Sequence, residues 1–115
     1  MDIEIKIYIF SEYGEAVLGR GPIELLENVD SMGSIRSAAL NMNMSYSKAH
    51  GRIRRIEKNL KKKILKRKIG GKNGGGSCLT PYARSLVVEY RNLENRIKNI
   101  ADKEFEGFIR NISCN

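Results

Sequence analysis

The 115-residue chain lacks most of the residues on which enzymatic and redox chemistry depends. It has no tryptophan, one histidine and two cysteines. Cys78 and Cys114 lie 36 positions apart with no histidine or further cysteine beside them, whereas a structural zinc site needs clustered ligands. His50 has no acidic neighbour in the sequence to orient it as a general base. We therefore expect reduced thiols, no metal site, no cofactor and no enzymatic activity.

A long apolar run is also missing. No uninterrupted stretch approaches the roughly 20 apolar residues of a membrane-spanning helix. The first residues, Met1-Asp2-Ile3-Glu4, lack the basic start and apolar centre of a signal peptide. With 115 residues, 41% of them hydrophobic, the chain can build one compact domain with its own core but no second domain. We expect a cytoplasmic protein that does not bind membranes, with no effector domain in this chain.

Acidic residues are scarce in the middle of the chain. The window Lys48–Lys72 holds twelve of the twenty-one lysines and arginines and a single acid, Glu57. Its net charge is +11, against −4 for residues 1–47 and +1 for residues 73–115. A localised excess of positive charge attracts a partner that carries regularly spaced phosphates. The window therefore predicts a DNA-binding surface.

The N-terminal residues alternate in polarity. Isoleucine occupies positions 3, 5, 7 and 9, and Glu4, Lys6, Tyr8 and Phe10 lie between and after them. This period of two predicts a half-buried strand over residues 3–10. A turn at residues 12–15 and a return strand at residues 16–18 would complete a hairpin, which needs another element to cover it.

Three short helices are predicted next. Gly21-Pro22 begins the first and Gly33 ends it, since proline suits the first helical turn and glycine the residue after the last. Ser34 is the expected N-cap of the second helix, and Ser45, after a tight break at residues 43–44, that of the third. The third helix has an apolar stripe at positions 49, 53, 56 and 60 and basic residues on its other faces. Two short helices of which the second is strongly basic predict a helix-turn-helix whose later helix can enter the major groove.

A glycine-rich run stands at the end of the basic window. The pattern predicts a strand over residues 64–69, a loop over Gly70–Ser77, and a returning strand at Cys78-Leu79 before Thr80 caps the next helix. A strand, a basic loop and a strand after a recognition helix describe a wing, which brings amides and cations to phosphates or the minor groove. The wing favours a DNA-binding helix over the alternative of a merely solvated amphipathic helix.

The last helix carries a heptad seam. It begins at Thr80-Pro81, and apolar residues recur from Ala83 at spacings of three and four. Residues 101, 105, 108 and 112 continue one register over, although Gly107 weakens the helix beyond about residue 106. So long a seam is hard to bury within one small domain, and we predict a homodimer. The alternative is packing against the N-terminal hairpin. The predicted interface residues are Leu86, Tyr90, Leu93, Ile97 and Ile100.

Several of these motifs occur together in one known family. They are Leu25-Leu26, Asp30, Gly33-Ser34-Ile35, Ala38-Ala39, Met44-Ser45-Tyr46, Ala49, the run Gly70–Gly76 and Leu79-Thr80. In these residues the chain resembles, over roughly residues 18–97, the N-terminal DNA-binding domain of the ModE-type, molybdate-responsive transcription regulators. The resemblance implies a winged helix-turn-helix, similar to that of LysR-type regulators, that dimerises through a long C-terminal helix and binds palindromic operator DNA.

The expected architecture is α+β and mainly helical. Residues 1–79 would form the winged helix-turn-helix with its N-terminal hairpin, and residues 80–112 the dimerisation helix of the same compact unit. By the resemblance, Ser45 and Tyr46 open the recognition helix, and Lys72 with its glycine neighbours forms the wing. The predicted DNA-binding residues are Ser45, Tyr46, Ser47, Lys48, His50, Arg52, Arg54, Arg55, Lys66, Arg67, Lys68, Lys72 and Asn73.

Two departures from the family affect function. The family usually has Trp and Asp where this chain has His50 and Gly51, so its base preference does not transfer. The molybdate-binding domains of full-length members are absent from these 115 residues, so oxyanion sensing has no basis in this sequence.

The basic window allows three other interpretations. A nonspecific or architectural nucleic-acid-binding protein would carry the same charge, although the window lacks the aromatic residues on which single strands stack. A nucleotide-binding enzyme would need Ser or Thr after Gly71-Lys72, where Asn73 stands. A membrane-surface helix would need an apolar face that inserts. The sequence favours a homodimeric, sequence-specific transcription regulator whose partner is double-stranded DNA.

Overall fold

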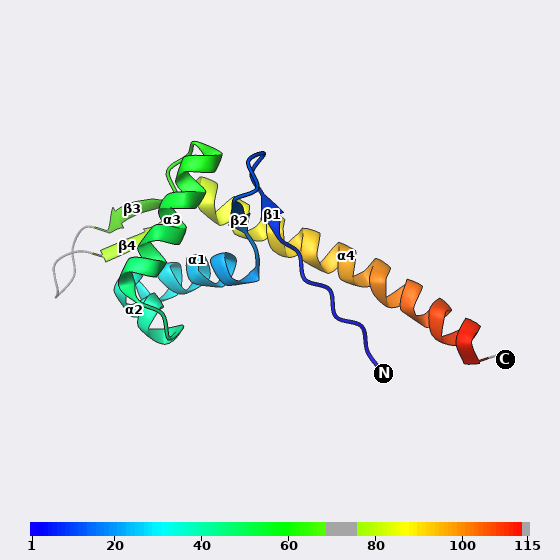
Figure 1. Cartoon of the computed structure of the whole chain (residues 1–115). Coiled ribbons are helices and arrows are strands. Elements are labelled where there is room, and N and C mark those ends of the chain that lie inside the picture. The colour runs from blue at the N-terminus through cyan, green and yellow to red at the C-terminus, as the bar shows by residue number, and fades with distance from the viewer. Residues whose placement is uncertain (69–75, 114–115) are drawn as a thin grey trace.

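The computed structural model describes residues 1–68 and 76–113 of the chain (Figure 1). Four helices and two small antiparallel sheets make up this part. The helices are α1 (Arg20–Met32), α2 (Ile35–Asn41), α3 (Tyr46–Leu60) and α4 (Pro81–Ser113). The strands are β1 (Ile9–Phe10), β2 (Ala16–Leu18), β3 (Leu65–Lys68) and β4 (Gly76–Leu79), with β1 paired to β2 and β3 to β4. The predicted α+β winged helix-turn-helix with a long C-terminal helix is confirmed.

The first three helices begin and end where the sequence predicted. The Ser34 hydroxyl accepts a 3.0 Å hydrogen bond from the Ser37 amide at the start of α2. The Ser45 hydroxyl accepts one of 3.1 Å from the Lys48 amide at the start of α3. Gly33 ends α1 with φ +84°, a backbone conformation that costs glycine little. These local contacts fix the short turn between α2 and α3.

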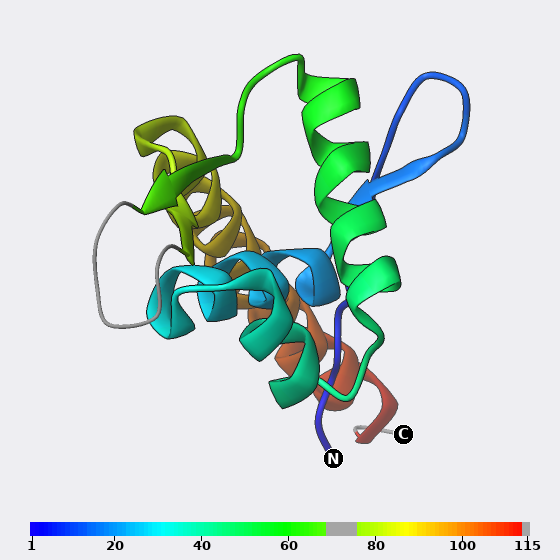
Figure 2. The ribbon, with the colours of Figure 1, turned by 90° about the vertical axis from the view of Figure 1, so that its left-hand side faces the viewer.

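Helix α1 lies at the centre of the molecule, and α2, α3, α4, β2 and β4 all contact it. Its apolar residues at positions 23, 25, 26 and 29 are fully buried. Residues of the other elements complete the core; they are Val17, Leu18, Ala38, Ala39, Ala49, Ile53, Ile56, Ile64, Leu79, Ala83 and Tyr90. Because α2 and α3 both pack on α1, the outer face of α3 is left for solvent or a partner (Figure 2).

The hairpin of β3 and β4 follows α3 directly. Lys66 pairs with Cys78 and Lys68 with Gly76 in the antiparallel register. The glycine-rich segment that joins the strands, residues 69–75, lies outside the described residues, as do Lys72 and Asn73 within it. Cys78 is a free thiol, and Cys114 also lies outside the described residues.

The predicted strand over residues 3–10 is wrong for most of its length. Only Ile9 and Phe10 pair with β2, because β2 offers just three residues and a strand needs a partner along its backbone. Residues 3–7 run beside α4 instead (Figure 1). The Tyr90 hydroxyl of α4 donates a 2.9 Å hydrogen bond to the Ile7 carbonyl oxygen. Of the four alternating isoleucines only Ile7 packs against the core, while Ile3, Ile5 and Ile9 remain 37% exposed.

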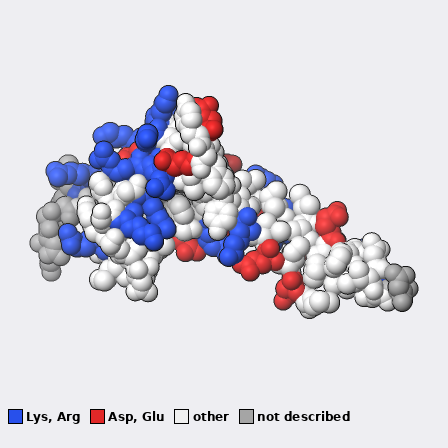
Figure 3. All heavy atoms as spheres, in the orientation of Figure 1, with Lys and Arg blue, Asp and Glu red and all other residues white. Residues whose placement is uncertain are grey.

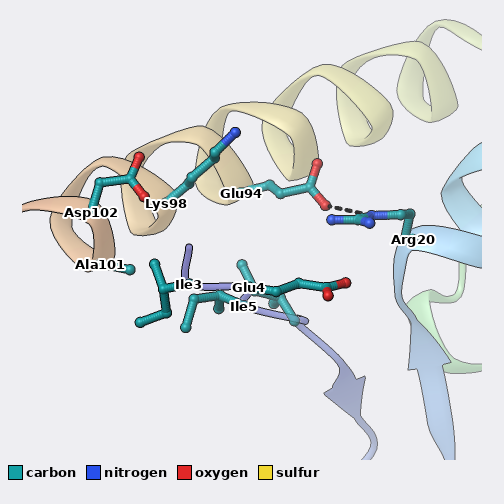
Figure 4. Close-up of a pocket in the computed structure, with 9 residues that line it drawn as sticks. Ile3, Glu4, Ile5, Arg20, Glu94, Lys98, Ala101 and Asp102 are labelled. Atoms are coloured by element: carbon teal, nitrogen blue, oxygen red, sulfur yellow. Dashed lines mark hydrogen bonds and ion pairs between the residues drawn. The ribbon is translucent and has the colours of Figure 1, made fainter. Parts of the chain in front are cut away.

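A hollow of about 160 Å³ lies between this N-terminal segment and α4 (Figure 4). Ile3 and Ile5 line it on one side and Ala101 on the other. A 3.4 Å ion pair between Arg20 and Glu94 lies at the end of the hollow that is farther from Ala101. The N-terminal segment therefore covers one side of the outer part of α4, where Ile97 and Ile100 remain exposed.

Helix α4 extends far beyond the helical core and gives the molecule its length of 66 Å, against 32 and 25 Å in the other directions. The expected weakening beyond residue 106 does not end the helix, which continues past Gly107 to Ser113. One interior glycine costs only about 1 kcal/mol relative to alanine, which the good helix formers around it can offset. None of the helices in residues 1–68 or 76–113 is long and apolar enough to cross a membrane.

Candidate DNA-binding surface

Helix α3 presents one face to the core and the opposite face to solvent. Ala49, Ile53 and Ile56 are buried against the rest of the domain. Because a helix turns by about 100° per residue, the positions opposite them are 47, 51, 54 and 58. All four of those residues are exposed. In Figure 2 this helix stands between the β3–β4 hairpin and the N-terminal hairpin.

The basic residues of α3 divide into two groups. Arg55 is held by the N-terminal hairpin, with its Nε 3.9 Å from a Glu15 carboxylate oxygen and its Nη1 3.5 Å from the Ala16 carbonyl oxygen. Arg52 is partly buried, and its guanidinium lies over Gly21 at the start of α1. These two arginines, both predicted to touch DNA, therefore also hold the domain together.

The second group is Lys48, Arg54 and Lys58. All three are exposed, and none takes part in an ion pair within the described residues. Their charges are thus available to a partner. Lys58, a residue of the basic window, extends the outward stripe of α3 by one further turn.

A three-layer stack joins α2 to the beginning of α3. The Arg36 guanidinium carbon lies 5.3 Å from the centre of the Tyr46 ring, and that ring stacks on His50 at 5.8 Å with 27° between the planes. Tyr46 and His50 were both predicted to lie near DNA, and the structure brings them together. The sequence reasoning missed Arg36, since it lies outside the basic window and its contact to Tyr46 follows from the turn between the helices.

Strand β3 adds three exposed cations beside α3, at Lys66, Arg67 and Lys68. Their partners across the hairpin are small residues, Cys78, Ser77 and Gly76, none of which carries a negative charge. Figure 3 shows the consequence: in this view lysine and arginine side chains gather over the end of the molecule formed by α3 and β3. On the face of α4 seen in this view, the far half shows few such side chains and some acidic groups.

Asp30 of α1 fixes the base of this hairpin. One carboxylate oxygen accepts hydrogen bonds from the Leu79 amide at 3.1 Å and from Arg84 at 3.2 Å. Burial by itself raises the pKa of Asp30, but these hydrogen bonds and the Arg84 charge outweigh it and leave the pKa below its usual value. The ionised carboxylate therefore ties β4 to both α1 and α4.

Residues 22–84, which run from the start of α1 into α4, match the family described as bacterial regulatory helix-turn-helix protein, lysR family. The chain belongs to this family. In this lysR-family domain, α2 and α3 form the helix-turn-helix, and β3 with β4 flanks it. The likeness seen in the sequence to LysR-type and ModE-type domains is therefore confirmed.

Three relatives agree with the family. The transcriptional regulator ModE of Haemophilus influenzae is 40% identical over 72 residues, which cover 63% of this chain and 28% of the relative. The molybdenum transport protein ModE of Azotobacter vinelandii is 36% identical over 81 residues, 70% of this chain and 30% of the relative. The DNA-binding transcriptional dual regulator ModE of Escherichia coli K12 is 34% identical over 68 residues, 59% of this chain and 26% of the relative.

The matched segment spans less than a third of each of these relatives. What the lysR-family chain shares with them is a ModE-like, DNA-binding helix-turn-helix domain. The family consists of regulatory proteins, so the alternative of a nucleotide-binding enzyme, which depended on the glycine-rich run, is set aside.

Proposed function

We propose that the protein is a cytoplasmic, sequence-specific transcription regulator that binds double-stranded DNA as a homodimer. Helix α3 enters the major groove, and the hairpin of β3 and β4 lies on the backbone or in the minor groove beside it. The observation that carries the proposal is the exposed basic surface of α3 and β3, in which Lys48, Arg54 and Lys58 have no acidic partner among the described residues.

The residues of this surface have different expected roles. Ser47, Lys48 and His50, in the first turns of α3, lie nearest the base edges, and a lysine there can donate two hydrogen bonds to guanine. The Ser45 hydroxyl already accepts a hydrogen bond from the Lys48 amide, so Ser45 serves mainly to position the helix. The phosphate contacts are expected from Arg54, Lys58, Lys66, Arg67 and Lys68, and from Lys72 and Asn73 of the segment outside the described residues.

Salt dependence tests the binding mode. A dimer that neutralises about six to ten phosphates should lose about 10³- to 10⁵-fold in affinity between about 50 and 200 mM salt. Fluorescence anisotropy with a labelled duplex measures this directly. Affinity that does not change with salt would rule the proposal out, since phosphate contacts release bound counterions.

Specificity separates this function from the nonspecific or architectural alternative. A specific regulator should prefer its own site over bulk DNA by at least about 10³-fold. Duplexes selected by the purified protein from a random library would be competed with sheared genomic DNA and with RNA. Equal competition by all three would favour the architectural function.

The homodimer is proposed from the exposed apolar residues of α4. Tyr90 is only 3% exposed and belongs to its own chain's core, against which Leu86 also packs. Farther along the helix, however, Ile97 is 37% and Ile100 58% exposed. Phe108 and Ile112 are also more than half exposed. We infer that a second copy of α4 covers this outer part of the seam, from Leu93 onward.

Such a dimer would present two copies of α3 to one duplex. Recognition helices related by a two-fold axis bind half-sites roughly 34 Å apart, about one turn of DNA. Footprinting on the selected duplexes should therefore reveal two protected half-sites with inverted sequence. A single protected half-site would contradict binding as a homodimer.

A further inference from the structure

Helix α3 carries a glycine in the middle of its outward face. Gly51 is exposed, has no left-handed backbone angle, and a Cβ atom placed on it would meet no atom within 4 Å. A glycine inside a helix is less stable than an alanine because it loses more backbone freedom on folding. The isolated chain therefore gains nothing from the missing side chain at this position.

Other glycines of the domain have a visible reason within the chain. Gly33 needs its positive φ of +84° to end α1. A Cβ on Gly76 would overlap the Gly33 carbonyl oxygen, and a Cβ on Gly21 would press on the Arg52 guanidinium. Gly51, like Gly107 of α4, has no such reason within the chain, and what distinguishes it from Gly107 is its place on the proposed DNA-binding surface.

The surroundings of Gly51 are positively charged. It lies in an open hollow of about 480 Å³ on the outer face of α3, with Arg54, Arg55 and Lys58 along its sides. Glu15 and Glu57 complete the lining, and Glu15 is paired with Arg55. Long cationic side chains thus surround a stretch of bare helix backbone. This shape fits an anionic partner that comes close to the helix itself.

We propose that Gly51 is the point at which α3 and the DNA duplex approach each other most closely. Without a side chain there, the helix sinks far enough into the major groove for Lys48 to reach the base edges, while the long side chain of Arg54 reaches a phosphate at either depth. In this chain, which has Gly51 where the family usually has Asp, a side chain at position 51 would hold the helix farther from the groove and weaken the contact of Lys48 with the bases. The inference rests on the proposed function and adds the residue that sets the depth of insertion.

Substitution of Gly51 separates this role from folding, because the two effects have opposite signs. Gly51→Ala should raise Tm by about 3–5 °C, as expected for a better helix former in a domain of this size. At the same time it should weaken binding to the selected duplexes by about fivefold or more, because steric overlap costs affinity. Gly51→Leu, which keeps a good helix former but is larger, should weaken binding further, by about a hundredfold.

Gly107→Ala is the matched control. Gly107 is also inside a helix, in α4, and a Cβ there would make only an ordinary 3.7 Å contact to Arg110. This variant should raise Tm in the same way and leave DNA affinity unchanged. Light scattering on all variants would verify that the oligomeric state is the same in each comparison.

The salt dependence identifies the cause of the loss. A neutral methyl group removes no phosphate contact, so the Gly51→Ala line of log affinity against log salt should shift without changing its slope. Wild-type affinity in Gly51→Ala, or a flatter slope, would overturn the inference. Failure of the proposed function is distinguishable, since the wild-type protein itself would then bind duplexes without salt dependence or preference.

Discussion

The Ser77 amide donates a 2.8 Å hydrogen bond to the Gly33 carbonyl oxygen, so that β4 is joined to the residue that ends α1. The neighbouring Gly76 lies so close to the same carbonyl that no side chain fits between them. Gly33 is also the last residue before the Ser34 cap of α2. The base of the β3–β4 hairpin is therefore fixed against the helix-turn-helix, and both parts of the basic surface keep a constant relation to each other.

Gly76→Ala tests this contact. The added Cβ must displace backbone rather than a flexible side chain, so we expect a loss of about 1–3 kcal/mol in the free energy of unfolding. Urea denaturation measures the loss. Ser77→Ala is the control, because it keeps both the Ser77 amide and the backbone path. If the two variants were equally stable, β4 would not be held as closely to Gly33 as the structure has it.

The ion pair of Asp30 and Arg84 predicts a pH-dependent contribution to stability. Because the folded state lowers the pKa of Asp30, the contribution is present above the unfolded value of 3.8 and is lost as the pH falls through the lower, folded value. At neutral pH, Asp30→Asn should cost about 1 kcal/mol, since the pair is partly exposed to solvent. As the pH falls through the folded pKa of Asp30, which lies below 3.8, the variant and the wild type should converge.

Denaturation at several pH values measures this convergence. Asp102→Asn removes an exposed carboxylate on α4 and controls for the change in net charge. If the difference in free energy of unfolding between Asp30→Asn and the wild type stayed the same down to acid pH, the charge of Asp30 would not stabilise the base of the β3–β4 hairpin.

The two groups of arginines on α3 predict different phenotypes for neighbouring residues. Arg54→Ala removes one phosphate contact from each copy in the proposed dimer, so it should reduce the salt slope of DNA binding by about 2, and it should change stability little. Arg55→Ala should instead lower the free energy of unfolding, by about 0.5–1 kcal/mol, because Arg55 contacts Glu15 and Ala16. Anisotropy titrations and urea denaturation of both variants test the division. If both variants showed the same change in salt slope and the same change in free energy of unfolding, the two arginines would not have separate roles.

The sequence predictions were accurate where local interactions decide the structure and failed where long-range contacts decide it. The ends of α1, α2 and α3 were predictable because Gly33, Ser34 and Ser45 act within one helical turn. The strand over residues 3–10 was predicted wrongly because alternation shows that a strand is possible, not that a partner strand is there to pair with it. The separation of Arg55 from Arg54 depends on the N-terminal hairpin about 40 residues earlier, and no local pattern contains it.

The hydrogen bond from Tyr90 predicts how the N-terminal segment is held. Tyr90→Phe keeps the buried ring but leaves the Ile7 carbonyl oxygen without its donor, which should cost about 1 kcal/mol. Hydrogen exchange should become faster in residues 3–8, while α1 and α3 stay protected. Tyr82→Phe, on an exposed ring of the same helix, is the control. Unchanged exchange in residues 3–8 would mean that apolar packing alone holds the segment.

The exposed seam of α4 gives the test of the homodimer. Ile100→Glu places a charge in the middle of the proposed interface, so light scattering should detect monomers at concentrations where the wild type is a dimer. Asn99→Glu introduces the same charge about 100° around the helix from Ile100 and about 160° from Ile97, outside the proposed seam. This control should stay dimeric.

The monomeric variant should still fold, because Ile100 is exposed in a single chain, but it should protect one half-site of the operator rather than two. If Ile100→Glu stayed dimeric, another surface would have to join the copies. If the wild type occupied two half-sites as separate monomers, the seam of α4 would not join them.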